Sequence, residues 1–340
     1  MTYVVAGQSD PGLPTLALVL DPAVLVRHLS GLFQRDISAD IRIKVLRWKR
    51  ADRCTLEIAL RPLEEHVPLT IATGWIELIG KVYAEDRTDV YRTMEEIRLA
   101  GFEPDAEFGI PHAVAFLPSL RLLLYEKAPG ARARKVIAAS QDGDDAAHAA
   151  VQCARWLAQF HARGPRSGAV FDLNAHLTAL ERARRYLSVR RSPPTDGADA
   201  LFGRLATAAS RLGSAELRAS HGTYTPGQVL LADERTLTID WDTYQLADPA
   251  YDVARFLVEL KRMGLKYTGS SDGYRTTAEA FLTAYAAVAE SEVRSRLAFH
   301  EAAICLDRAQ HDVEKQDPVK AQAMLREGMR LLTEDRWETH

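Results

Sequence analysis

The chain has 340 residues, with 43 Lys and Arg against 46 Asp and Glu, a formal net charge of −3, and 47% hydrophobic residues. That hydrophobic share over this length is enough to form one large or two smaller domains with real cores, and it excludes a disordered chain. The near-neutral charge gives no long-range field that attracts nucleic acid or anionic lipid, so we expect neither as a partner.

Sequence features that bear on location point to a soluble protein of a reducing compartment. The longest apolar stretches, such as residues 16–20 and 23–26, are far shorter than the ~20 residues that span a bilayer. Cys54, Cys153 and Cys305 show no CxxC spacing, which argues against a disulfide framework or a zinc site. We therefore expect a cytoplasmic protein without a membrane segment.

The first part of the chain carries mostly strand signals. A cap-like Asp21 before Pro22 predicts a helix over residues 22–33. The strands that we predict from alternating or apolar runs span residues 41–48, 54–60, 75–83, 113–117 and 120–125. The first two are separated by a short polar segment and predict a hairpin. Residues 88–100 place apolar side chains at helical spacing and end at Gly101, which predicts one internal helix.

Beyond a predicted linker at residues 126–130, helical patterns dominate. We predict helices over 145–162, 173–188 and 198–212 and a helical series over 274–334. A strand–turn–strand island, residues 229–231 and 237–239, interrupts them, and such islands among helices often hold functional sites. The predicted fold class is therefore α+β. It has a small antiparallel β-rich N-lobe, residues 1–126, and a larger, mostly helical C-lobe, residues 127–340.

The segment from residue 220 to residue 260 contains an ordered series of short motifs. In chain order they are His221-Gly222, Pro226-Gly227, the apolar run 229–231, Ile239-Asp240-Trp241, and Asp248-Pro249 with Asp252. In order and spacing, this segment resembles the catalytic region of the aminoglycoside phosphotransferase and choline-kinase-like family. Residues 79–83 also resemble that family's strand whose lysine contacts nucleotide phosphates. The resemblance extends over most of residues 20–335 and implies a bilobal protein-kinase-like fold.

The resemblance also implies ATP and Mg²⁺ as cofactors and a set of residues that hold them. Lys81 takes the position of the phosphate-binding lysine, and Glu95 or Glu96 that of its ionic partner. We prefer Glu95 because the apolar side chains of Tyr91 and Leu99 flank it at i−4 and i+4. Phosphoryl transfer depends mainly on positioning and charge neutralisation, which these side chains are suited to provide.

Gln228 and Asp240 take the positions of the family's metal ligands. An amide oxygen and a carboxylate suit Mg²⁺, which prefers oxygen ligands and keeps several waters. Asp248 before Pro249 is expected to cap a helix, and Asp252 is expected to brace the catalytic loop. We expect His221 to form hydrogen bonds within its loop and not to serve as a base.

The sequence departs from the family's pattern at Thr223, where the motif has the aspartate that orients the acceptor hydroxyl. A threonine hydroxyl is no base near neutral pH, and Asp242 is the best candidate for a substitute base if residues 240–242 are extended. Two functions therefore stay open. The first is a phosphotransferase that acts on a hydroxyl of a small molecule or peptide. The second is a pseudokinase that binds nucleotide or substrate without transfer and acts as a regulatory partner of another protein.

One basic cluster in the first predicted hairpin has two interpretations. Lys49, Arg50 and Arg53 are placed to cover phosphates. However, the turn has no glycine to let backbone amides approach them, so a solvated hairpin is an equal alternative.

Overall fold

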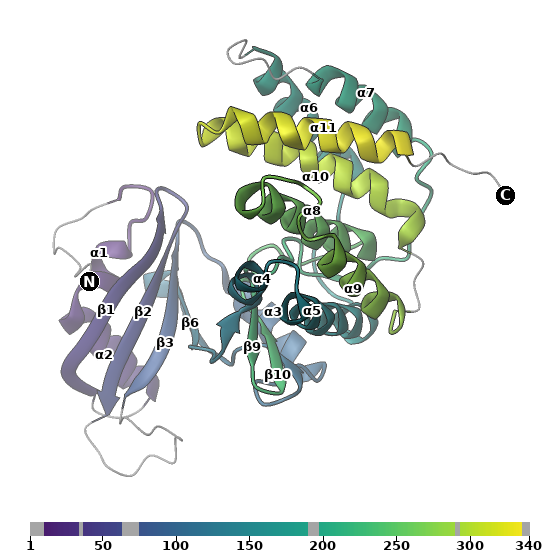
Figure 1. The fold of residues 1–340 in the computed structure, drawn as a ribbon. Coiled ribbons are helices and arrows are strands. Elements are labelled where there is room, and N and C mark those ends of the chain that lie inside the picture. Colours follow the sequence, from purple (N-terminus) through teal and green to yellow (C-terminus); the bar gives the residue numbers. More distant parts are fainter. Residues whose placement is uncertain (1–9, 34–36, 63–74, 190–196, 290–292, 335–340) are drawn as a thin grey trace. The chain divides into compact units, whose positions relative to one another are not determined.

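The computed structural model describes residues 10–33, 37–62, 75–189, 197–289 and 293–334. The chain divides into two compact units, Met1–Pro129 and Gly130–His340 (Figure 1). The first unit is built on a β-sheet and the second mainly on helices, as the composition of the two halves predicts.

The first unit is an antiparallel five-stranded sheet with the strand order β1-β2-β3-β6-β5. Its strands are β1 (Ile37–Lys49), β2 (Arg53–Pro62), β3 (Ile76–Tyr83), β5 (Ala113–Leu117) and β6 (Leu122–Glu126). The remaining elements are α1 (Leu16–Leu20), α2 (Pro22–Phe33), α3 (Thr88–Leu99), β4 (Phe108–Gly109) and the 3₁₀ turn η1 (Pro118–Leu120). The strands and helices that the sequence predicts in this unit are all present.

The core of this unit lies between the sheet and the helices α1 and α2 (Figure 1). Alternate residues of β2, from Cys54 to Leu60, point into it, together with Leu25 and Leu29 of α2. Gly80 of β3 belongs to the same face, where a Cβ atom would come within 2.9 Å of the Ile58 side chain. The next residue, Lys81, therefore points to the opposite face of the sheet, because successive side chains of a strand alternate.

The second unit is mostly helical. Its helices are α4 (Ala133–Ser140), α5 (Asp144–Arg163), α6 (Leu173–Val189), α7 (Ala198–Ala209), α8 (Pro249–Tyr267), α9 (Arg275–Ala286), α10 (Arg294–Glu314) and α11 (Pro318–Glu334). Its strands are β7 (Ala131–Arg132), β8 (Arg218–Ser220), β9 (Val229–Ala232), β10 (Arg235–Thr238) and β11 (Gln245–Ala247). Strand β9 pairs with β7 and β10, and β8 pairs with β11.

An aromatic cluster lies beneath the hairpin of β9 and β10. The Trp156 ring on α5 stacks on Phe160 and Tyr224, with centroid distances of 5.1 and 5.8 Å, and Trp241 lies 5.1 Å from Phe160. All four side chains are buried. Because Tyr224 belongs to the segment 221–228 and Trp241 to the segment 239–244, the cluster anchors both segments to helix α5.

Two further findings concern the whole described chain. No helix within the described ranges is long and apolar enough to cross a membrane. The three cysteines are free thiols and all are buried.

Candidate active site

The candidate site is formed by two segments of the second unit. The first is the loop between β8 and β9, residues 221–228, and the second follows β10, residues 239–244. Pairing of β8 with β11 brings the beginning of the first segment beside the end of the second, with Ser220 opposite Gln245. The main-chain N–H of Ile239 also donates to the Gln228 carbonyl at 3.0 Å. The fold therefore holds Gln228 next to Asp240.

Asp252 holds the beginning of the loop. Its fully buried carboxylate, in the first turn of α8, accepts hydrogen bonds from the main-chain N–H groups of His221 at 2.7 Å and Gly222 at 2.9 Å. Burial alone would raise the pKa of Asp252, but the hydrogen bond from His161 and the nearby His161 and His221 rings outweigh it, so the pKa is lowered. An ionised Asp252 therefore braces the loop, as expected from the sequence.

Asp248 begins helix α8 and ties it to α10. Its carboxylate accepts the N-cap hydrogen bond from the Ala250 N–H at 2.9 Å, and it also accepts from Arg296 and, at 3.0 Å, from His300. The expected capping role is confirmed. The same cap fixes where α8 starts and hence where Asp252 lies beneath the loop.

His221 forms its hydrogen bonds within the site. Its Nε2 donates to the Ile239 carbonyl at 3.0 Å, which leaves Nδ1 to accept from the Thr223 N–H at 3.4 Å. The ring also lies 4.7 Å from the Trp241 ring. The contact with Thr223 lies within the loop, as expected from the sequence, whereas the contacts with Ile239 and Trp241 link the loop to the second segment.

Thr223 is part of a chain of hydroxyl hydrogen bonds. The Thr243 hydroxyl donates to the His221 carbonyl at 2.9 Å, so its oxygen is left to accept the Thr223 hydroxyl proton across 2.9 Å. The Gln228 side-chain amide approaches the Thr223 oxygen at 3.4 Å. Thr223 therefore uses its hydroxyl to hold the loop and offers no basic group to an acceptor.

Gln228 and Asp240 lie side by side. Gln228 Nε2 is 3.5 Å from Asp240 Oδ2, and Gln228 Oε1 accepts a hydrogen bond from the Thr225 hydroxyl at 2.9 Å. Asp240 has a φ of +77°, a left-handed conformation that is rare outside Gly, Asn and Asp. Such conformations are concentrated at functional sites, where the surrounding structure enforces them.

The pair suits a magnesium ion better than a zinc ion. Two adjacent ligands of Mg²⁺, each about 2 Å from the ion, lie about 3 Å apart, which is close to the observed separation. A rotation of the Gln228 amide by half a turn presents its oxygen to the ion, and Thr225 is then able to accept from the amide nitrogen. Within the described ranges, no group of three or more His, Cys, Asp or Glu residues has the geometry of a metal site. Two oxygen ligands from the protein would leave the other positions of a Mg²⁺ ion for water and phosphate oxygens.

The structural condition for Asp242 as a substitute base is not met. Its placement beside Asp240 was expected for an extended segment, but the φ of +77° at Asp240 and a turn at Asp242 and Thr243 interrupt the chain there. A hydrogen bond from the Tyr244 N–H to the Trp241 carbonyl, 3.3 Å, closes that turn. The role of Asp242 stays a prediction without this geometric support.

The remaining candidates belong to the first unit. Lys81 is only 4% exposed and lies between Thr55 of β2 and Leu123 of β6 on the face of the sheet opposite α1 and α2. On α3, Glu95 forms an ion pair with Arg98 at 3.1 Å, and Leu99 is 74% exposed. Because Leu99 does not pack against the sheet, the flanking residues do not distinguish Glu95 from Glu96.

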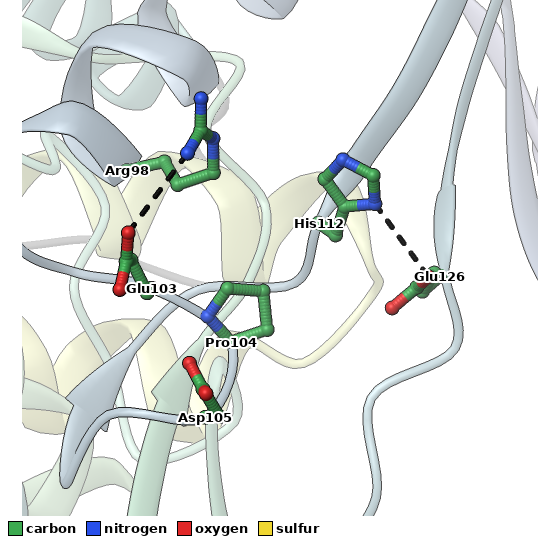
Figure 2. A pocket seen from close by; sticks show the side chains of 6 residues that line it. All are labelled: Arg98, Glu103, Pro104, Asp105, His112 and Glu126. Carbon is green, nitrogen blue, oxygen red and sulfur yellow. Dashed lines mark ion pairs between the residues drawn. The ribbon is translucent and has the colours of Figure 1, made fainter. Parts of the chain in front are cut away.

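The sequence did not predict an open pocket of about 400 Å³ at the end of α3 (Figure 2). Figure 2 shows the ion pair of His112 with Glu126, 3.5 Å, and that of Arg98 with Glu103, 4.0 Å, on opposite sides of Pro104. Carboxylates outnumber basic side chains in this lining, and no predicted site residue belongs to it.

Comparisons with known proteins identify the family of this chain. Residues 88–300, which are more than half of the chain, match the model of the phosphotransferase enzyme family APH. The chain therefore belongs to the phosphotransferase enzyme family. The matched region includes the whole loop and hairpin, whereas Lys81 precedes it.

Solved structures with the same fold include kinases of small molecules. A thermostable mutant of aminoglycoside phosphotransferase APH(4)-Ia, in complex with ADP and hygromycin B, aligns with a TM-score of 0.60 at 16% identity and covers 90% of this chain and 98% of its own. Choline kinase LicA from Streptococcus pneumoniae aligns with a TM-score of 0.58 at 13% identity, over 92% and 98% of the two chains.

A choline/ethanolamine kinase family protein from Mesorhizobium loti aligns with a TM-score of 0.53 at 16% identity, over 85% and 87%. No curated protein matches this chain by sequence. At these identities the likeness establishes the fold, and the predicted bilobal protein-kinase-like class is confirmed.

Proposed function

We propose that this protein is an ATP- and Mg²⁺-dependent phosphotransferase that acts on a hydroxyl of a small molecule or peptide in the cytoplasm. The observation that carries the proposal is the pair of oxygen-bearing side chains, Gln228 and Asp240, held 3.5 Å apart by a loop whose N–H groups are tied to Asp252. Family membership and neighbours solved with ADP and hygromycin B support a nucleotide and a small hydroxylated acceptor as ligands.

Each residue has a specific role in this proposal. Gln228 and Asp240 hold Mg²⁺, which neutralises charge on the phosphate oxygens. Lys81 places a positive charge on the nucleotide phosphates, and Glu95 or Glu96 orients it. Asp252 and His221 keep the loop in one conformation, so that no reorganisation is needed when the ligands bind.

The hydrogen bonds of Thr223 support a second candidate function. Its hydroxyl donates to Thr243 and accepts from the Gln228 amide, so the loop has no group at this position to accept a proton from an acceptor hydroxyl. In this second candidate, the protein binds nucleotide but does not transfer phosphate, and it acts as a regulatory partner of another protein.

A transfer assay distinguishes these two candidates. Release of ADP from ATP and Mg²⁺ is measured with choline, hygromycin B and a Ser- and Thr-containing peptide as acceptors, for the wild type and for Thr223→Asp. General-base catalysis contributes typically ~10²- to 10⁴-fold, so Thr223→Asp is expected to raise the acceptor-dependent rate by a factor in that range. Thr223→Ser keeps the hydroxyl and is expected to leave the rate unchanged.

Acceptor-dependent ADP release by the wild type supports the phosphotransferase. Release by Thr223→Asp alone supports the non-transferring candidate. If both proteins bind nucleotide and neither transfers phosphate to any acceptor, the proposed phosphotransferase activity is wrong.

A further inference from the structure

The edge strand β1 carries four basic residues on one face. Arg42 and Lys44 lie opposite Ala59 and Glu57 of β2, whereas Arg47 and Lys49 lie opposite Thr55 and Arg53. All of these β2 residues point to the open face of the sheet, away from the core that lies between the sheet and the helices α1 and α2. In a regular strand, positions 42 and 44 would face opposite to positions 47 and 49.

A β-bulge brings the four side chains to the same face. The pairing of β1 with β2 shifts by one residue between Val45 and Arg47, which leaves Leu46 as the extra residue, 45% exposed. Val45 and Trp48 consequently both pack against the core, and Arg47 turns to the open face. Bulges of this kind redirect side chains and are over-represented next to functional sites.

The strand register places Arg47 and Lys81 in the same row of residues across the sheet, with Thr55 between them. Arg47 pairs with Thr55, and Thr55 pairs with Lys81 on the next strand. Two strand spacings separate Arg47 and Lys81, which is about 10 Å between their backbones. Both side chains project from the same face and are long enough to reach one triphosphate chain between them.

The turn between β1 and β2 has little capacity to bind phosphate through its backbone. The Ala51 N–H donates to Asp10 Oδ2 at 3.0 Å, and the Asp52 N–H donates to the Lys49 carbonyl at 3.2 Å. Asp10 also accepts from the Trp48 ring N–H, and a Cβ atom at Gly12 would come within 2.4 Å of Ala51. The segment that contains Asp10 and Gly12 thus packs directly on the turn and occupies the Ala51 N–H, while the turn's own Lys49 carbonyl occupies the Asp52 N–H.

Among the residues that the structure describes, the acidic side chains on this face pair with residues other than Arg47. The acidic residues Glu57 and Glu77 both pair with Lys127, at 3.3 and 3.2 Å, and Lys49 pairs with Asp52 at 2.6 Å. Arg42 lies over the Trp75 ring at 4.2 Å.

From these observations we infer that Arg47 binds the polyphosphate chain of the nucleotide together with Lys81, so that basic side chains replace the backbone amides of a glycine-containing turn. This inference rests on the proposed function, because the ligand is the nucleoside triphosphate. Arg suits the role because its planar guanidinium donates two parallel hydrogen bonds to phosphate oxygens.

Calorimetric titration of the full chain tests this role of Arg47. The ligands are the nonhydrolysable ATP analogue AMP-PNP and adenosine, and the proteins are the wild type, Arg47→Ala and Arg42→Ala. Arg42→Ala is the matched control because it removes the same charge from the same face of the same strand. Arg42 pairs with Ala59, which is four residues along β2 from Thr55, the residue that pairs with Lys81. Arg47 is exposed, so its replacement is expected to leave the thermal unfolding midpoint unchanged.

We expect Arg47→Ala to weaken AMP-PNP binding about tenfold or more and to leave adenosine binding unchanged, since only the phosphate contacts are lost. Arg42→Ala should stay within about twofold of the wild type. Equal AMP-PNP affinity in Arg47→Ala and the wild type overturns the inference, and so does an equal loss in both variants.

Failure of the proposed function would appear in the wild type itself, as an absence of AMP-PNP binding, and not as a difference between the variants. If the wild type binds no AMP-PNP, the nucleotide proposal fails, and titration with sodium tripolyphosphate then tests the basic face alone. Tripolyphosphate binding that Arg47→Ala abolishes keeps the anion-binding role of this face. Absence of tripolyphosphate binding to the wild type overturns that role as well.

Discussion

Gly222 allows the loop of residues 221–228 to pass directly beside the segment that follows β10. It has a φ of +79°, and a Cβ atom built on it would lie 2.3 Å from the Thr243 carbonyl oxygen. An L-residue is disfavoured in this conformation and would also push Thr243 away. Since Thr243 accepts from Thr223 and donates to His221, the displacement would disrupt the whole chain of hydroxyl hydrogen bonds.

We predict that Gly222→Ala lowers the free energy of unfolding by at least about 2 kcal/mol, from the left-handed backbone and the contact together. Urea unfolding of the purified protein measures this change. Gly203→Ala is the matched control, since its Cβ atom would meet nothing within 4 Å in helix α7, and it should stabilise by about 0.5 to 1 kcal/mol. Equal stability of Gly222→Ala and the wild type would contradict the tight approach.

At the scale of single residues, the sequence predicted that Gln228 and Asp240 lie close together. It did not predict the direction of the neighbouring side chains or their hydrogen-bond partners. The motif order was enough to bring Gln228 to Asp240. The direction of Asp242 depends on the φ of +77° at Asp240, which is set by tertiary contacts. The choice between Glu95 and Glu96 relied on Leu99 as a buried neighbour, and helical spacing alone does not determine which apolar residue is buried.

Helix α8 is the element that connects the candidate site to the helical core. Its N-cap, Asp248, is 5% exposed. Burial by itself would raise the pKa of Asp248, but the hydrogen bond and charge of His300, the hydrogen bond from Arg296 and that from the Ala250 N–H together lower it from 3.8 to about 2. The ionised carboxylate is therefore more stable in the folded protein than in the unfolded chain.

We predict a stability loss in acid that depends on this cap. A carboxyl group with a lowered folded-state pKa contributes its full stabilisation above the unfolded value near 4, and this contribution is lost as the pH falls from about 4 to about 2. For Asp248 the contribution is about 2 kcal/mol. Urea unfolding between pH 7 and pH 2 should show a steeper decline for the wild type than for Asp248→Asn. Parallel curves for the two proteins would show that Asp248 is not the group responsible.

Predictions for whole elements succeeded where the residue pattern was long. The alternating runs of β1 and β2 and the helical spacing of α3 identified these elements closely. The three-residue strands β8 and β11 are too short to show a period, and the eight-residue helix α4, which is separated from the predicted linker by two residues, was not predicted. The bulge at Leu46 was not predicted either, because its apolar side chain continues the strand pattern and only the pairing with β2 reveals the shift.

For the molecule as a whole, average composition was a poor guide to local charge. A net charge of −3 over 340 residues predicts no attraction for anions. The strand register nevertheless gathers Arg42, Lys44, Arg47 and Lys49 on one face of the first unit. The second unit holds Gln228 and Asp240, the proposed magnesium ligands.

We propose that Asp240 and Gln228 form a magnesium-dependent nucleotide site, and calorimetric titration with AMP-PNP, with and without Mg²⁺, tests this assignment. The variant is Asp240→Asn, because Asn tolerates the left-handed backbone at this position. Glu234→Ala, an exposed change in the β9–β10 turn, is the control.

We expect the wild type and Glu234→Ala to bind AMP-PNP more tightly with Mg²⁺, and Asp240→Asn to lose about tenfold or more of that affinity. Binding that is insensitive both to Mg²⁺ and to Asp240→Asn would contradict the assignment of the site.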